Sequence, residues 1–282
     1  MIQGFMIRSR MTTCVLIGFF FAVATPAFSN DSRASPSAKH LLYVGNSFFY
    51  YNNSLHNQVG RLLSAALPKA QRDQYTAYSL TISGGHLRWH DVGAYLDVGI
   101  GSSSFSESNE LINAATPHKF DTVMMMDCSR CPYDATTRPI FHEYARKHSQ
   151  AARARGVEPV FFMTWAYSDK PEMTEILLRE YVKAGRDNHA LVVPAGLAFR
   201  QALAKHPDLR LHVADRRHPS PEGTYLAACT VLASLYGINP VGNRFHAGLP
   251  PEVAENLQRI AWETTQDFLA QESTIHETKD LH

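Results

Sequence analysis

Short apolar runs alternate along this chain with longer amphipathic stretches, and this alternation constrains the fold more than any other feature. Each run is bounded by turn-forming or polar residues, as buried strands are. A strand followed by a helix, repeated several times, predicts a parallel sheet with helices on both faces. The expected strands are residues 40–45, 77–82, 121–126, 159–164 and 191–193.

The stretches between and after these runs carry apolar residues at three- and four-residue steps, which is typical of helices. One of them has clear end signals: Ser220 can cap it, Pro221 suits the first helical position and Gly237 can end it. The expected helices are residues 54–66, 139–155, 170–186, 195–205, 221–236 and 250–270.

The first residues have the composition of a targeting segment. Two arginines precede an apolar run, residues 14–24, that is too short to span a bilayer securely, and Ala27 and Ser29 fit a signal-peptidase site. We expect a signal peptide over residues 1–29, cleavage near Ser29 and export to the periplasm or the outside. An uncleaved N-terminal anchor is the alternative, because the run is strongly apolar.

The remaining residues read as one folded domain between two polar ends. Residues 30–39 are rich in Ser, Ala, Pro and Asp and predict a disordered lead-in. Residues 40–272 are long enough for one sizeable core and predict a single domain. Residues 273–282 are polar, and we expect them to form a frayed tail.

Charge excludes some classes of partner. The formal net charge is +1, and no run of like charges occurs. The charged residues of the expected leader are two arginines, so its removal makes the chain slightly more acidic. Such a chain lacks the basic surface of nucleic-acid or anionic-membrane binding proteins. A small-molecule or glycan ester is therefore the expected partner, with no nucleic acid and no stable membrane insertion after processing.

Three cysteines lie in the expected domain. Cys128 and Cys131 have a C-x-x-C spacing, which allows a disulfide in an oxidising compartment but does not decide it. Cys229 would then be a small buried apolar residue. One C-x-x-C supplies too few zinc ligands, and no second pair has metal-binding spacing, so we expect no metal.

A hydroxyl near the start of the domain and an imidazole near its end are the candidate catalytic groups. Ser47 follows the first expected strand and precedes a helix, where a strand end can lift its hydroxyl among backbone amides. His218 can take a proton from serine and return it to a leaving group, while Asp215 steadies the ring. Considered separately, Ser47 could simply cap a helix, and Asp215 and His218 could be a solvent-exposed pair in a loop.

The position of these residues supports that pairing. Parallel strands bring ligands to their carboxyl ends, so the loops around 45–47 and 83–85 and the residues after Met126 should share one rim. Aromatic residues near that rim could stack on sugar rings or line an acyl pocket. His86 and His90 are further pocket candidates, although a structural role is the simpler expectation for each.

These motifs resemble the SGNH/GDSL hydrolase superfamily. Gly45-Asn46-Ser47-Phe48 is similar to its first block and Asp215–His218 to its last, in the same order along the chain. The likeness is closer to bacterial members that read Gly-Asn-Ser-Phe and carry segments similar to 83–90 and 218–229. The resemblance covers roughly residues 41–236 and implies a three-layer α/β/α sandwich with a mainly parallel, about five-stranded, flavodoxin-like sheet.

The resemblance also implies which groups stabilise the oxyanion. A glycine of the second block, Gly85 or else Gly84, would donate its backbone amide, since glycine allows close backbone approach. The third block of the family supplies a side-chain amide, but this chain has Met124-Met125-Met126-Asp127-Cys128-Ser129 there. Asn46 or the hydroxyl of Ser129 are the substitutes we consider.

The expected activity is hydrolysis of a short acyl ester, such as an acetyl group on a carbohydrate, through an acyl-enzyme on Ser47 and without a cofactor. A lipase or thioesterase acting on longer chains is one alternative. A catalytically weak glycan-binding homologue is another, because the third-block amide is missing. A redox protein built on Cys128 and Cys131 is the least favoured.

Overall fold

The computed structural model describes residues 1, 38–98, 100–105, 108, 111–116 and 119–279. The expected signal peptide, apart from Met1, and most of the expected lead-in lie outside these residues. Among the described residues, no helix combines the length and the apolar character that crossing a membrane requires.

The core of the fold is a parallel five-stranded sheet in the order β2-β1-β5-β6-β7. The α/β class and the parallel sheet expected from the sequence are therefore confirmed, and each strand lies within two residues of its expected bounds. The strands are β1 (His40–Gly45), β2 (Thr76–Thr81), β5 (Thr122–Met125), β6 (Glu158–Phe162) and β7 (Leu191–Val193).

Alternate side chains of the central strands enter two separate cores, because successive residues of a strand face opposite sides of the sheet. In β1, Leu41 and Tyr43 pack into one apolar cluster, whereas Leu42 and Val44 pack into the other. All four side chains are fully buried. Burial on both faces explains why the strands appear in the sequence as continuous apolar runs.

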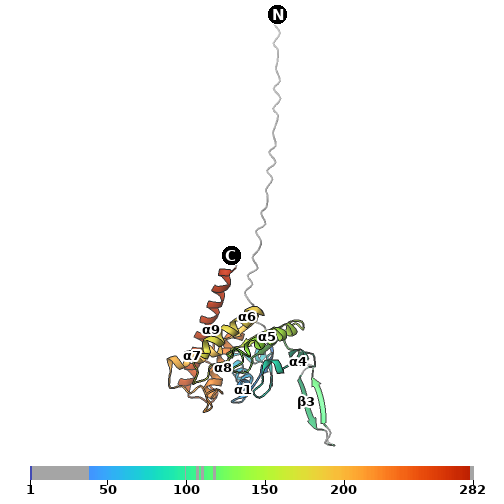
Figure 1. Cartoon of the computed structure of the whole chain (residues 1–282), viewed down its shortest axis with the longest axis horizontal. Helices are drawn as coiled ribbons and strands as arrows, with labels where there is room; N and C mark the ends of the chain where they lie inside the picture. The colour runs from blue at the N-terminus through green and yellow to red at the C-terminus, as the bar shows by residue number, and fades with distance from the viewer. Residues whose placement is uncertain (2–37, 99, 106–107, 109–110, 117–118, 280–282) are drawn as a thin grey trace. The chain divides into compact units, whose positions relative to one another are not determined.

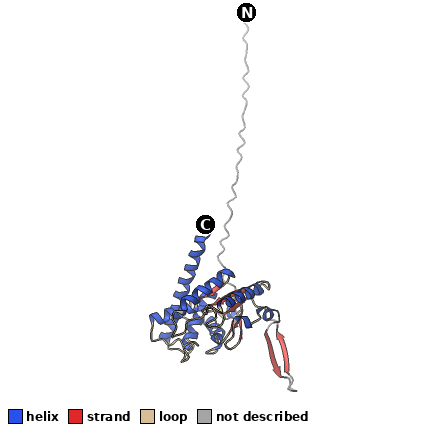
Figure 2. Ribbon diagram, in the orientation of Figure 1, coloured by secondary structure: helices blue, strands red, loops and turns tan. Residues whose placement is uncertain are grey.

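Helices cover both faces of the five-stranded sheet, and Figure 2 shows the strands of this sheet among them. One core receives apolar side chains from α2 (Leu55–Ala66), α7 (Ala195–Lys205), α8 (Pro221–Tyr236) and α9 (Pro251–Lys279). The other receives them from α5 (Arg138–Arg153) and α6 (Met173–Asp187), which lie next to each other in Figure 1. The short helices are α1 (Ser47–Tyr50), α3 (Lys69–Arg72), η1 (Leu87–Trp89) and α4 (Val92–Val98).

Two parts of the fold differ from expectation. The last helix, α9, continues to Lys279 instead of ending near residue 270. No glycine or proline interrupts residues 271–279, and Glu272 forms an ion pair with Arg186 of α6 at 2.8 Å. The antiparallel pair β3 (Ile100–Phe105) and β4 (Leu111–Thr116) was not anticipated either, because its serine- and alanine-rich sequence lacks clear alternation.

Candidate active site

The loops that follow β1, β2 and β5 are joined by the side chain of Asn46. Its Nδ2 donates to the carbonyl oxygens of Gly85 and Asp127, both at 3.1 Å, and its Oδ1 accepts from the amide of Phe48 at 3.2 Å. Asn46 is 3% exposed, so these bonds are shielded from water. The three rim loops are therefore fixed beside the candidate nucleophile.

Ser47 is the first residue of α1, directly after the end of β1. A Cβ on Gly45 would lie 2.8 Å from the side chain of Met126, so only glycine lets β1 approach the end of β5 so closely. Asn46 caps α1, and Ser47 itself is 7% exposed and lines a pocket of about 530 Å³. The serine hydroxyl is thus lifted to the rim, as the sequence suggested.

His218 lies in the loop before α8, and the start of that helix holds it in place. Ser220 caps the helix, since its Oγ accepts from the amide of Gly223 at 3.0 Å. A Cβ on Gly223 would lie 2.2 Å from the carbonyl oxygen of Leu211, so the helix start packs directly on the preceding segment. The Val213 amide donates to the His218 carbonyl at 2.9 Å and completes this support.

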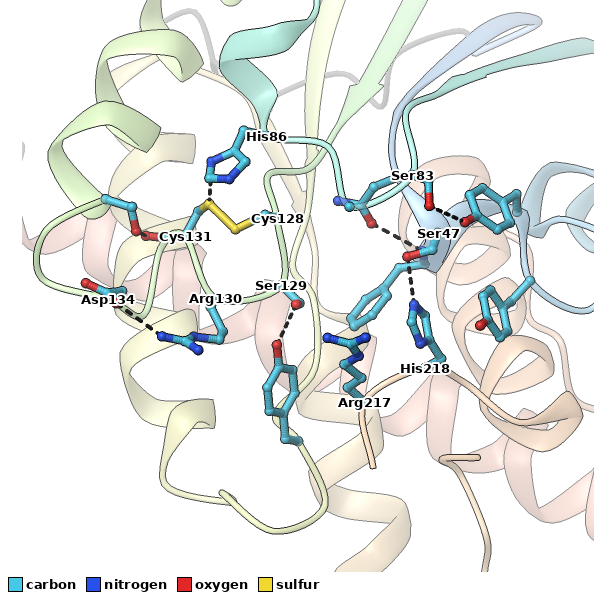
Figure 3. A pocket seen from close by; sticks show the side chains of 17 residues that line it. Ser47, Ser83, His86, Cys128, Ser129, Arg130, Cys131, Asp134, Arg217 and His218 are labelled. Atoms are coloured by element: carbon cyan, nitrogen blue, oxygen red, sulfur yellow. Dashed lines mark hydrogen bonds and ion pairs between the residues drawn. A yellow bond between two sulfur atoms is a disulfide. The ribbon is translucent and has the colours of Figure 1, made fainter. Parts of the chain in front are cut away.

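The imidazole of His218 links Ser47 to Asp215. Its Nε2 lies 2.8 Å from the Oγ of Ser47, and its Nδ1 hydrogen-bonds the Oδ2 of Asp215. Figure 3 shows the serine and histidine side chains next to each other at one side of the pocket, joined by this hydrogen bond. The structure therefore brings Ser47 together with Asp215 and His218, which lie 168 and 171 residues further along the chain. The three groups have the geometry of a nucleophile, a base and an orienting carboxylate.

Asp215 is held in its charged form. Partial burial alone would raise the pKa of its carboxyl, but hydrogen bonds from the His218 ring and from the amides of Arg217 and His218 hold that pKa well below its usual value. An ionised carboxylate at Nδ1 leaves Nε2 free to accept the serine proton. Asp215 is thus equipped to set the tautomer of the imidazole.

Aromatic rings pack around the imidazole. The ring of Tyr51 stacks on that of His218 with centroids 4.3 Å apart, and Phe48 meets it edge-on at 5.7 Å. Phe48 in turn stacks on Trp165, which is buried and whose Nε1 donates to the Arg217 carbonyl at 2.9 Å. The loop that carries His218 is therefore fixed to the core by an indole.

The backbone amides of Ser47 and Gly84 are the available oxyanion donors. Neither amide donates a hydrogen bond within the described part of the chain, and both residues line the pocket. Gly84 has a φ of +64°, a conformation that favours glycine. The Gly85 amide already donates to the Ile82 carbonyl at 2.8 Å, so the structure favours Gly84 over Gly85, the reverse of our expected order.

The structure also changes the roles considered for Asn46 and Ser129. Both N–H groups of Asn46 are used by carbonyl oxygens, so this side chain cannot also donate to an oxyanion. The Oγ of Ser129 does line the pocket, but it lies 2.8 Å from the hydroxyl of Tyr167 and shares a hydrogen bond with it. Among the described lining residues, Asn46 is the only side-chain amide.

The wall opposite His218 contains a disulfide. Cys128 and Cys131 form the disulfide that their C-x-x-C spacing allowed, and both residues line the pocket (Figure 3). Arg130 lies between them in the chain, and the guanidinium of Arg217 enters the pocket from the side of His218. Cys229 is free and buried in α8.

Two residues near the site escaped the sequence reasoning. Asn52 donates to the Pro219 carbonyl at 2.9 Å and to the Thr224 hydroxyl at 2.7 Å, which ties the turn after α1 to the start of α8. Tyr167 was missed because it follows β6 in a loop with no motif. The Asn52-Asn53 pair was a usable signal, since both residues adopt the positive φ that asparagine tolerates.

Solved structures of similar fold were found, although the sequence matches no family model and none of the curated proteins compared. A candidate SGNH hydrolase from Slackia heliotrinireducens aligns with 70% of this chain and 98% of its own, with 22% identity and a TM-score of 0.50. A DUF4886 family protein from Bacteroides uniformis aligns with 79% of this chain and 93% of its own, with 17% identity and a TM-score of 0.54.

A third similar structure is a catalytic mutant of Axe2, an acetylxylan esterase from Geobacillus stearothermophilus. It aligns with 74% of this chain and 98% of its own, with 17% identity and a TM-score of 0.51. At these identities the likeness concerns the fold. The chain has the fold of the SGNH hydrolases, as the first and last motifs suggested.

Proposed function

We propose that this chain, which has the SGNH-hydrolase fold, is a serine esterase that cleaves a carboxylic ester through an acyl-enzyme on Ser47. The observation that carries the proposal is the hydrogen-bonded series Ser47–His218–Asp215 at the rim of the sheet. A hydroxyl with an adjacent base and an oriented imidazole is the arrangement that activates serine.

In the first half of the reaction, the Oγ of Ser47 attacks the ester carbonyl carbon while His218 Nε2 takes the serine proton. Negative charge develops on the carbonyl oxygen, where the amides of Ser47 and Gly84 stabilise it. The C–O bond to the alcohol then breaks, and the imidazolium gives its proton to the departing oxygen.

The second half repeats these roles with water. His218 takes a proton from the water as its oxygen attacks the acyl carbon, and the imidazolium then returns a proton to the Oγ of Ser47 as the carboxylic acid leaves. Asp215 stays ionised throughout and stabilises the imidazolium. The cycle uses groups of this chain and water, and it requires no cofactor.

The proposed substrate is a short acyl group, such as acetyl, on a carbohydrate. Supporting this choice, the lining is rich in hydroxyls and charged groups, and the stacked rings of Tyr50 and Tyr51 border it, with Tyr50 38% exposed. Aromatic rings beside polar groups suit a sugar better than a long alkyl chain. The acetylxylan esterase among the similar folds points in the same direction.

A series of p-nitrophenyl esters from acetate to laurate, followed by acetylated oligosaccharides, tests this choice. We expect kcat/KM to be highest for acetate and acetate to be released from the oligosaccharides. A maximum at longer chains would favour the lipase or thioesterase alternative. Binding of the oligosaccharides without turnover of any ester would favour the glycan-binding alternative.

Export is also part of the proposal, and it rests on the composition of residues 1–29. Expression of the full chain in a bacterial host, followed by N-terminal sequencing of the exported protein, tests it. We expect the mature chain to begin at Asn30. A chain that stays in the cytoplasm with its first residues intact would contradict export.

A further inference from the structure

The disulfide in the pocket wall lies next to two other side chains that can bind metal. His86 Nδ1 is 3.1 Å from the Sγ of Cys131, and Asp127 immediately precedes Cys128. One potential ligand atom from each of these four residues lies within 4.8 Å of every other. Figure 3 shows the imidazole directly above the sulfur pair.

The backbone holds this cluster together independently of the disulfide. The Oδ1 of Asp127 accepts from the amide of Leu87 at 2.8 Å and from that of Cys128 at 2.6 Å. These bonds join the segment that begins η1 to the segment that follows β5, and His86 and the cysteines are adjacent to them. Because Asp127 is 2% exposed, the junction is shielded from water and should persist when the sulfur–sulfur bond is broken.

We propose that the reduced Cys128–Cys131 pair forms a binding site for a divalent cation of the zinc class, together with His86 Nδ1 and a carboxylate oxygen of Asp127. Two thiolates, an imidazole and a carboxylate are ligand types that zinc prefers, and a tetrahedral site places its ligand atoms roughly 3–4 Å apart. The Cα atoms of the two cysteines are 5.1 Å apart, so both sulfurs can turn toward one ion.

Disulfide and metal are alternative occupants of this position. With a phosphine as the reductant, the sulfur–sulfur bond breaks, water supplies a proton to each sulfur, and the water oxygen ends on the phosphine oxide. Metal binding then releases both thiol protons, and the imidazole keeps its proton on Nε2. The redox state of the surroundings therefore decides whether Cys128 and Cys131 form a disulfide or bind a metal ion.

The sequence alone argued against such a site, because one C-x-x-C supplies only two ligands. The fold supplies the other two from a preceding segment and from the residue before Cys128. His86, Cys128 and Cys131 line the same pocket as Ser47, but in the described structure none of them forms a hydrogen bond or ring contact with the hydroxyl or the imidazole of the proposed triad. The proposed metal site is thus separate from the groups that act on an ester.

Cobalt titration of the full chain tests the proposal, because thiolate-bound Co²⁺ absorbs in the near ultraviolet and tetrahedral Co²⁺ in the visible. After reduction by a phosphine, we expect one equivalent of Co²⁺ to produce both signals and Zn²⁺ to remove them. The oxidised protein should give neither. Absence of the thiolate signal in the reduced protein, or loss of its fold by circular dichroism, would overturn the proposal.

Variants separate this site from adventitious binding. Cys128→Ser/Cys131→Ser keeps the buried Cys229 and should lose the thiolate signal entirely. His86→Ala should weaken cobalt binding by at least about tenfold, since a protein ligand is removed. His246→Ala is the matched control, because His246 lies in the loop after α8 and is not among the residues that line the pocket. This variant should bind cobalt as the wild type does. Equal affinity in the two histidine variants would refute the assignment of His86.

Discussion

The ring of Tyr51 lies flat on the imidazole of His218, with centroids 4.3 Å apart and planes within 5° of parallel. Together with the hydrogen bonds at both ring nitrogens, this stack leaves the imidazole little freedom to rotate. An aromatic face also attracts positive charge, so Tyr51 should stabilise the imidazolium that forms when Ser47 loses its proton.

Two variants of Tyr51 distinguish the contribution of its ring from that of its hydroxyl. Tyr51→Ala should lower kcat about 3- to 30-fold, the range of one cation–π contact, with a smaller change in KM. Tyr51→Phe keeps the ring and should retain most of the activity. Steady-state kinetics with p-nitrophenyl acetate measure both, and equal losses in the two variants would contradict a role for the stack.

The two glycines of the second rim loop should respond differently to substitution. A Cβ on Gly85 would lie 2.8 Å from the Cβ and carbonyl oxygen of Ile82, so Gly85→Ala must shift the turn that presents the Gly84 amide. We expect kcat to fall at least about tenfold, since loss of one oxyanion donor costs about 100- to 1000-fold.

Gly84→Asn is the matched variant for this loop. Nothing lies within 4 Å of an added Cβ at Gly84, and asparagine tolerates its positive φ better than other residues do. We expect this variant to keep most of its turnover. A Gly85→Ala enzyme as active as the Gly84→Asn enzyme would show that the turn does not position the oxyanion.

Asn46 should matter for stability as much as for activity. Asn46→Asp keeps the acceptor for the Phe48 amide but removes the donors to the Gly85 and Asp127 carbonyls, leaving buried oxygens unpaired. At about 1–3 kcal/mol for each unsatisfied buried group, urea unfolding should show a loss of a few kcal/mol. An unchanged unfolding midpoint would mean that the loops are held together by other contacts.

The sequence predicted those parts of the site that depend on short, local patterns. Ser47 after the first strand and the Asp215–His218 pair before a capped helix could be identified because strand ends and helix caps are local features. The role of Asn46 could not, because its partners come from loops 39 and 81 residues further along the chain. Which of Gly84 and Gly85 donates to the oxyanion depends on which backbone amide already forms a hydrogen bond within the turn, and only backbone coordinates reveal that.

The sheet was predictable for a related reason. Strands buried on both faces leave continuous apolar runs, so β1, β5 and β6 were visible in the sequence. The pair β3–β4 has no such run. The helix α9 was expected to end near residue 270 because polarity was taken as a sign of fraying, whereas it continues to Lys279, and Glu272 forms an ion pair with Arg186.

Buried histidines should make stability depend on pH. Burial lowers the pKa of His90 from 6.5 to about 4, and it also lowers the pKa values of His56, His148 and His212. At these four positions the unfolded chain therefore binds more protons than the folded chain as the pH falls below 6.5. The free energy of unfolding should decrease with falling pH in this range, by up to about 1.4 kcal/mol per pH unit for His90.

His90→Gln tests this directly. Glutamine can still hydrogen-bond the Gly45 carbonyl, which His90 Nε2 approaches at 3.0 Å, but it does not titrate. Urea unfolding at pH values between 4 and 6.5 should give a shallower pH dependence for the variant than for the wild type. Identical slopes would contradict the burial effect at this position.

Labelling by a fluorophosphonate probe tests the central claim most directly, because the probe reacts only with an activated hydroxyl. The wild type and Ser129→Ala, which changes a neighbouring pocket hydroxyl, should both be labelled, and mass spectrometry should place the adduct on Ser47. Ser47→Ala should not be labelled and should not hydrolyse p-nitrophenyl acetate. Undiminished labelling of Ser47→Ala would contradict the assignment of Ser47 as the nucleophile.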